Sequence, residues 1–320
     1  MFPIFFLIVF SLIGGGALLY TPDKPRATLE AKYATEPSEF IPIAGLRMHV
    51  RDTGPKAAPT VILMHGLGSS LHTWEPWAQI LSVHYRVIRF DLPGFGLTGP
   101  DPTGDYSDAR AVAVLAALID KLSIQRASLI GNSMGGKLAW QFAAVHPDRV
   151  DKLVLISPDG FASPGFEYGK KAEVPVVARL LPYTLPTWML RMNLAPAYSD
   201  RSLLTDDTVA RYRDLMLAPG VRRALLDRTG QVQLEPPEPM LRRIHVPTLL
   251  VWGEKDALIP FSNAQDYLKA LPDAQLVAFP NLGHVPQEED PAQSLPPVEA
   301  FLADQSSIAS TSPTRIMEAK

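Results

Sequence analysis

Cysteine is absent from all 320 residues of this chain. Its absence excludes disulfide bonds, thiolate metal sites and a cysteine nucleophile. The sequence also contains no His-Glu-x-x-His metal motif and no glycine-rich phosphate loop. The net charge is only −3, which gives no electrostatic reason to expect a nucleic-acid partner. We therefore expect no metal, no cofactor and no nucleic acid.

Apolar sequence, in contrast, is abundant: hydrophobic residues make up 47% of the chain, enough for a sizeable core. Strand-like runs cover Glu39–Ile43, Arg47–Asp52, Thr60–His65, Tyr85–Phe90, Ala127–Ile130, Lys152–Ile156, Thr248–Trp252 and Gln275–Phe279. Helix-like runs cover Trp74–Leu81, Asp108–Leu122, Met134–His146, Ser262–Leu271 and Pro291–Leu302. This alternation predicts an α/β fold with a mostly parallel, eight-stranded sheet flanked by helices.

The most informative stretch is Gly131-Asn132-Ser133-Met134-Gly135-Gly136, between a strand-like and a helix-like run. A strand, a sharp turn and a helix with a serine at the apex predict a nucleophile elbow. Small residues two positions before and after the serine are needed because the turn brings neighbouring backbone close. We therefore expect the Ser133 hydroxyl to be a nucleophile.

A serine hydroxyl needs a general base, and with this elbow the chain order is serine, acid, histidine. His284 follows a strand-like run, at the sheet edge where α/β proteins place reactive groups. His146 ends the helix after the elbow, and His245 precedes a strand, so both are interpreted as structural. The predicted base is His284.

The acid that orients the base is expected in a loop at another strand end. Asp256 lies in such a loop, after Thr248–Trp252. Glu254 is a rival, but Lys255 beside it indicates a solvated charge pair. Asp159, at the end of an earlier strand, is a second rival. We predict Asp256 as the acid.

A site for negative charge on a carbonyl oxygen is expected near the nucleophile. The loop His65-Gly66-Leu67-Gly68 follows a buried strand-like run, and its glycines let the backbone turn inward. We assign the oxyanion hole to the backbone N–H groups of Leu67 and Met134. His65 is expected to brace the loop without transferring a proton.

The alternation stops between residues 159 and 243, where prolines and arginines are frequent and no strand-like run occurs. An insertion at this point predicts a helical cap after the sixth strand, covering the site and excluding water. Its Leu, Met, Trp and Tyr residues suggest an apolar substrate chamber.

The N-terminal run Phe2–Tyr20 contains no charged residue. As a helix it would span about 28 Å, close to the roughly 30 Å of a bilayer core. No Lys or Arg precedes it and Ala17–Tyr20 is a poor cleavage site, so we predict an uncleaved single-pass membrane anchor. Lys24, Arg26 and Lys32 follow the span and favour a cytoplasmic body.

The predicted organisation places six segments along the chain. They are a transmembrane anchor (1–20), a tether (21–37), a first core part (38–158), the cap (159–243), a second core part (244–303) and a disordered tail (304–320).

From about residue 38 to 303 the chain resembles the α/β-hydrolase family. The matching motifs are His65-Gly66-Leu67-Gly68, Asp91-Leu92-Pro93-Gly94-Phe95-Gly96-Leu97-Thr98, Gly131–Gly136, Gly253-Glu254-Lys255-Asp256 and Gly283-His284. The resemblance implies an α/β-hydrolase fold and catalytic roles for Ser133, Asp256 and His284.

We expect a membrane-anchored serine hydrolase, similar to esterases and monoacylglycerol lipases, that cleaves small apolar esters through an acyl-enzyme. One alternative is a carbon–carbon bond hydrolase of ring-cleavage products, whose elbow is similar. Those enzymes carry an aromatic residue after the base, where this chain has Val285. Another alternative is a binding protein on the same scaffold with little turnover. Serine at the elbow excludes the aspartate-dependent dehalogenases and epoxide hydrolases.

Overall fold

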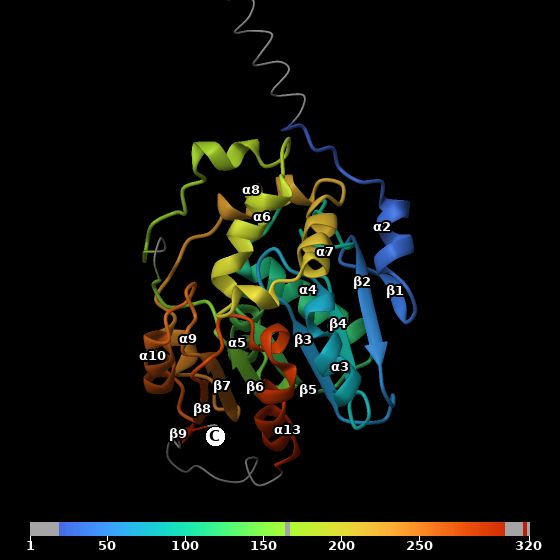
Figure 1. The fold of residues 1–320 in the computed structure, drawn as a ribbon. Coiled ribbons are helices and arrows are strands. Elements are labelled where there is room, and N and C mark those ends of the chain that lie inside the picture. The colour runs from blue at the N-terminus through green and yellow to red at the C-terminus, as the bar shows by residue number, and fades with distance from the viewer. Residues whose placement is uncertain (1–18, 164–166, 305–315, 319–320) are drawn as a thin grey trace, which may run out of the picture.

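The computed structural model describes residues 19–163, 167–304 and 316–318 (Figure 1). Within them a nine-stranded sheet has the order β1-β2-β4-β3-β5-β6-β7-β8-β9. β2 is antiparallel to both β1 and β4, and all other neighbours are parallel. The strands are β1 (Ser38–Ile43), β2 (Leu46–Thr53), β3 (Thr60–Met64), β4 (Arg86–Phe90), β5 (Ala127–Asn132), β6 (Val150–Ile156), β7 (Thr248–Gly253), β8 (Ala274–Phe279) and β9 (Ile316–Glu318). The predicted α/β fold with a mostly parallel sheet is confirmed.

Helices cover both faces of this sheet (Figure 1). α3 (Glu75–Leu81) and α13 (Pro296–Ala303) share a hydrophobic cluster on one face. α4 (Asp108–Lys121), α5 (Met134–Val145) and α10 (Ser262–Ala270) share a larger cluster on the other. In α4 the buried side chains recur at three- and four-residue steps, so one apolar stripe faces the sheet.

The helix predicted over Pro291–Leu302 is divided into α12 (Pro291–Ser294) and α13. Pro296 and Pro297 open α13. Proline has no N–H with which to continue the ladder of the preceding helix, whereas it suits the first turn of a new one. The break therefore follows from two adjacent residues.

The segment between β6 and β7 forms the helical cap above the carboxyl ends of the strands (Figure 1). Its described helices are η3 (Val176–Leu180), α6 (Thr187–Leu194), η4 (Ala195–Ala197), η5 (Arg201–Leu203), α7 (Asp206–Met216), α8 (Val221–Thr229) and α9 (Glu238–Leu241). The cap has a hydrophobic cluster of its own, which also includes Val285 from the loop after β8. That loop therefore packs into the cap.

Residues 20–33, called the N-terminal strap below, lie against the cap. The Thr21 N–H donates to the Tyr183 carbonyl at 2.8 Å. The Lys24 N–H donates to the Leu217 carbonyl at 2.7 Å. In the structure, the segment predicted as a tether packs on the cap, because its backbone N–H groups donate to cap carbonyls.

The strap ends in α2 (Arg26–Tyr33), a helix that was not predicted. One cap carboxylate, Asp214 on α7, accepts hydrogen bonds from Lys24 at 2.6 Å, Lys32 at 3.0 Å and Tyr33 at 2.9 Å. These three bonds join the strap to α7.

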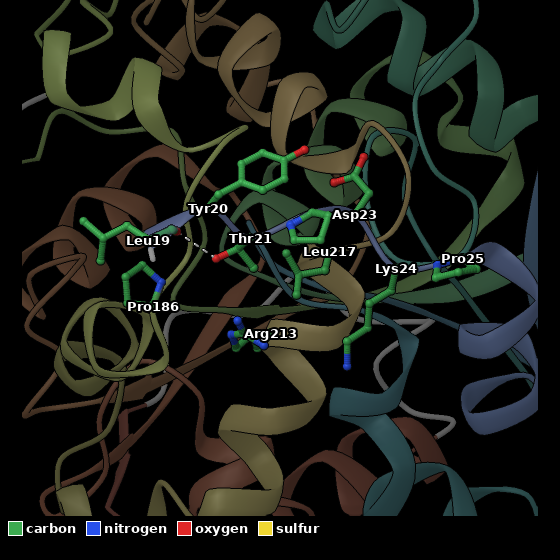
Figure 2. A pocket seen from close by; sticks show the side chains of 10 residues that line it. Leu19, Tyr20, Thr21, Asp23, Lys24, Pro25, Pro186, Arg213 and Leu217 are labelled. Atoms are coloured by element: carbon green, nitrogen blue, oxygen red, sulfur yellow. Dashed lines mark hydrogen bonds between the residues drawn. The ribbon is translucent and has the colours of Figure 1, made fainter. Parts of the chain in front are cut away.

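A pocket of about 570 Å³ lies where the strap meets the cap (Figure 2). It is lined by Leu19, Tyr20, Thr21, Pro22, Asp23, Lys24, Pro25, Pro186, Arg213 and Leu217. Most of these residues belong to the strap itself.

The predicted single-pass N-terminal anchor is wrong by this structure. Across residues 19–163, 167–304 and 316–318, no helix has both the length and the apolar character that crossing a bilayer requires. Residues 20–25 are not helical, and the backbone N–H groups of Thr21 and Lys24 bond to the cap. The rest of the predicted span, residues 2–18, lies outside the described residues.

The tail predicted to be disordered contributes Ile316–Glu318 as β9, which is parallel to β8. Unpaired N–H and C=O groups along the edge strand β8 explain how three residues can pair there. The stretches 305–315 and 319–320 of that tail lie outside the described residues.

Candidate active site

Ser133 forms a sharp corner between β5 and α5, with φ 54° and ψ −119°. A positive φ is unusual for a residue with a side chain. The glycines around it are sterically required: a Cβ on Gly131 would lie 2.2 Å from the Gly135 carbonyl oxygen, and one on Gly135 would lie 2.2 Å from that of Met64. The predicted elbow geometry is present.

The backbone of Ser133 is held on both sides. Its N–H donates to the Ile156 carbonyl at 2.9 Å, at the end of β6. Its carbonyl accepts from the N–H of Lys137 at 3.0 Å and of Asp159 at 3.1 Å. The side chain is partly exposed, so a ligand can reach it.

His284 and Asp256 meet at the carboxyl ends of β8 and β7. Nδ1 of His284 lies 2.8 Å from Oδ2 of Asp256. Oδ1 of Asp256 accepts from the N–H groups of Leu258 at 2.8 Å and Ile259 at 2.9 Å. Burial alone would raise the pKa of the Asp256 carboxyl, but His284 and these two N–H groups outweigh burial and hold that pKa below its usual range. Asp256 is therefore a carboxylate that orients the imidazole.

The side chain of Asn132 joins the His284 loop to the elbow. Its Nδ2 donates to the His284 carbonyl at 2.9 Å and to the Ile156 carbonyl at 3.2 Å. Because Asn132 immediately precedes Ser133, this amide holds the backbone of His284 beside the elbow. The N–H of His284 donates to the cap, to the Ala197 carbonyl at 2.9 Å.

The other acids and histidines considered from the sequence lie in different surroundings. Glu254 is exposed, and so is His245. His146 caps the C-terminus of α5 and packs on Phe142, with ring centroids 4.8 Å apart. Asp159 lies next to Ser133 through its backbone, and burial raises the pKa of its carboxyl despite the opposing effect of nearby Lys137.

The 65–69 loop lies against the elbow. A Cβ on Gly66 would come within 3.2 Å of the Ser133 Cβ. The Ser69 N–H donates to the Gly66 carbonyl at 3.3 Å, which closes a turn with Gly68 at φ 70°. In such a turn the N–H of the second residue, Leu67, is not used by the turn itself.

His65 is fully buried beneath this loop. Its Nε2 accepts from the Leu92 N–H at 2.9 Å, so Nδ1 carries the proton and donates to the Gly66 carbonyl at 2.8 Å. Burial lowers the pKa of His65, which keeps the ring neutral. Both ring nitrogens are thus occupied in holding the loop.

Two groups of this site have no role in the sequence-based prediction. Asn132 lies inside the elbow motif, where the glycines and the serine account for the pattern. Glu289 follows His284 in a polar run, and nothing in the sequence indicates its buried contacts. Within the described ranges, no group of three or more His, Cys, Asp or Glu side chains could hold a metal ion.

Comparison with known proteins agrees with this geometry. The family model described as alpha/beta hydrolase fold matches residues 59–291. A 2-hydroxy-6-oxononadienedioate/2-hydroxy-6-oxononatrienedioate hydrolase from Comamonas testosteroni is 31% identical over 268 residues, covering 79% of this chain and 91% of that protein.

Two solved structures are also similar. A membrane phospholipase A described as a bacterial virulence factor has a TM-score of 0.74 at 26% identity, over 97% of this chain and 100% of that one. The enol-lactonase from Burkholderia xenovorans LB400 has a TM-score of 0.72 at 25% identity, over 84% of this chain and 100% of that one. With the family match, the elbow and the sheet order in agreement, this chain belongs to the α/β-hydrolase fold family.

Proposed function

We propose that this hydrolase cleaves carboxylic esters through an acyl-enzyme formed on Ser133. The observation that carries the proposal is the His284–Asp256 pair, fixed beside the elbow by the side chain of Asn132. A phospholipase A and an enol-lactonase, both of which act on ester bonds by their names, are among the similar structures. The expected substrate is a small apolar ester.

In the proposed reaction His284 acts as general base. Because Asp256 occupies Nδ1, Nε2 is the nitrogen that remains to take the Ser133 proton. Oγ then attacks the ester carbonyl carbon, and the N–H groups of Leu67 and Met134 stabilise the resulting oxyanion. The tetrahedral intermediate collapses, the C–O bond of the ester breaks, and His284 gives its proton to the departing alcohol.

Water completes the cycle. His284 takes a proton from water as the oxygen attacks the acyl carbon, and the acyl–Oγ bond breaks. The proton returns to Ser133, so one ester and one water give one acid and one alcohol. Asp256 stabilises the imidazolium in both halves of the cycle.

The test is labelling with a fluorophosphonate followed by turnover of p-nitrophenyl and glyceryl esters. Ser133→Ala is expected to abolish labelling and to lower kcat by about 10³-fold or more. Lys269→Ala, at an exposed residue of α10, is a matched surface control that should leave both unchanged. A loss below tenfold in folded Ser133→Ala would exclude this serine as the nucleophile.

A second candidate is hydrolysis of a carbon–carbon bond, favoured by the relative from Comamonas testosteroni at 31% identity. Adding a dienoic ketone acid to the ester panel separates the two. Labelling with cleavage of that acid and no ester turnover would favour the second candidate. The absence of labelling would favour a binding protein on this fold.

A further inference from the structure

The carboxylate of Glu289 joins the loop after β8 (residues 280–285, called the base loop below) to the cap. Oε1 accepts from the Gly283 N–H at 2.8 Å, next to His284. Oε2 accepts from the N–H of Ser199 in the cap at 2.7 Å. The Ser199 hydroxyl shares its single proton between Oε2 at 2.8 Å and the Asn281 carbonyl at 2.6 Å. Glu289 is only 6% exposed, so these three donors, together with the His284–Ala197 bond, seat the base loop on the cap.

The neighbouring carboxylate, Glu288, bonds both to Tyr198, next to Ser199, and to α7 of the cap. It accepts from Arg211 on α7 at 2.7 Å and from the hydroxyl of Tyr198. The Tyr212 hydroxyl on α7 lies 3.3 Å from Glu288 and 3.2 Å from Oγ of Ser69. This chain of contacts runs from α11 (Pro286–Glu289) through α7 to the 65–69 loop.

We propose that Glu289 and Glu288 are positioning residues that make the seated cap a working part of the catalytic centre. Glu289 sets the base loop, and Glu288 with Tyr212 sets the loop that carries the Leu67 N–H. The proposal rests on the proposed function, because it takes His284 as the base. The cap then holds the catalytic loops in place as a fixed part of the catalytic centre.

A carboxylate is the group that this arrangement requires. Both oxygens of Glu289 face donors, and a carboxylate offers only acceptors. A glutamine would turn its NH₂ toward either Gly283 or Ser199, where another donor already points. The loop would then shift, and a displacement near 1 Å at a catalytic group can lower the rate about 100-fold.

The test compares Glu289→Gln and Tyr212→Phe with wild type on p-nitrophenyl acetate, after titrating competent serines with a fluorophosphonate. For Glu289→Gln we expect kcat per titrated serine to fall about 10- to 100-fold. KM should change less than about threefold, and the phosphonylation rate should fall in parallel with kcat. For Tyr212→Phe, a change of one hydroxyl, a fall of about 3- to 10-fold is expected. Glu173→Gln, at an exposed carboxylate of the cap, is the control and should stay within about twofold.

A purely structural role would lower the melting temperature and the fraction of titratable serine, with kcat per titrated serine unchanged. That result in Glu289→Gln would overturn the proposal for the base loop, and in Tyr212→Phe the proposal for the 65–69 loop. A change confined to KM would do the same. If Glu289→Gln does not fold, Ser199→Ala removes one of the three donors and takes its place. Its kcat per titrated serine is then compared with that of the wild type. Loss of labelling in His284→Ala tests the base itself, so failure of the proposed function is recognised separately.

Discussion

His72 lies in the interior between α2 and the core, and its ring is held at both nitrogens. Nε2 contacts the Tyr33 carbonyl at 3.0 Å, and Nδ1 lies 3.2 Å from Oγ of Ser70. Burial lowers the pKa of His72 to about 4, although the negative charge of nearby Asp91 acts to raise it. The folded protein therefore keeps this ring neutral at a pH where the unfolded chain protonates it.

This shift makes folding stability depend on pH. Between the unfolded pKa of about 6.5 and the folded value of about 4, the unfolded state binds the extra proton, so stability falls as the pH falls. We expect urea unfolding to show a loss of about 2–3 kcal/mol between pH 7.5 and 4.5 from this group. His72→Gln, which can still donate to Tyr33, should reduce the loss, and equal pH slopes for the two proteins would contradict the expectation.

Single residues also show what sequence patterns can predict. The motifs place Asp256 and His284 at neighbouring strand ends, and the structure brings them within hydrogen-bond distance. Their catalytic roles stay a prediction. Asn132 and Glu289 could not be assigned, because a buried hydrogen bond to a distant loop leaves no periodic or spacing signal in one sequence.

At the scale of elements, the strap was the least predictable part. Its prolines and charges are typical of a linker, and its partners lie far along the chain: Asp23 pairs with Arg222 at 2.7 Å, and Lys24 with Asp214 at 2.6 Å. Strands and core helices, in contrast, follow from apolar periodicity, because each buries a continuous face. Local patterns predict such elements, whereas a segment held by ion pairs and caps depends on the finished fold.

The contribution of the Asp214 contacts to the free energy of unfolding can be tested. Asp214→Asn removes the charge that three donors share, and we expect a loss of about 2–3 kcal/mol in the free energy of unfolding. Urea denaturation measures it. Asp207→Asn, at an exposed carboxylate of the same helix, should change stability by less than about 0.5 kcal/mol. Equal effects of the two substitutions would show that the Asp214 contacts add no stability.

At the scale of the whole molecule, the cap contacts the core at separate places. His284 bonds to Ala197, and Glu289 bonds to Ser199. The strap bonds to α7 through Lys24 and to α8 through Asp23, and it reaches the core through the Tyr33 carbonyl, which contacts His72. Arg228 of α8 reaches the Pro93 carbonyl at 3.3 Å. A lid attached at one hinge would open on its own, whereas attachment on several sides links the cap to the sheet.

We therefore expect cap and core to unfold as one cooperative unit. Hydrogen exchange should give amides of α7 and of β6 the same opening free energy, within about 1 kcal/mol, in rising urea. Asp214→Asn should lower the value for α7 more than that for β6. Wild-type α7 exchanging about 2 kcal/mol more easily than β6 would instead identify an independently opening cap.

The bond between the His284 N–H and the Ala197 carbonyl bears on how such enzymes can be recombined. In this chain, a cap from another enzyme grafted between β6 and β7 would lack the Ala197 and Ser199 contacts that hold residues 281–289. A productive chimera has to transplant both stretches together, although the contacting residues Ser199 and Glu289 are 90 positions apart in the sequence.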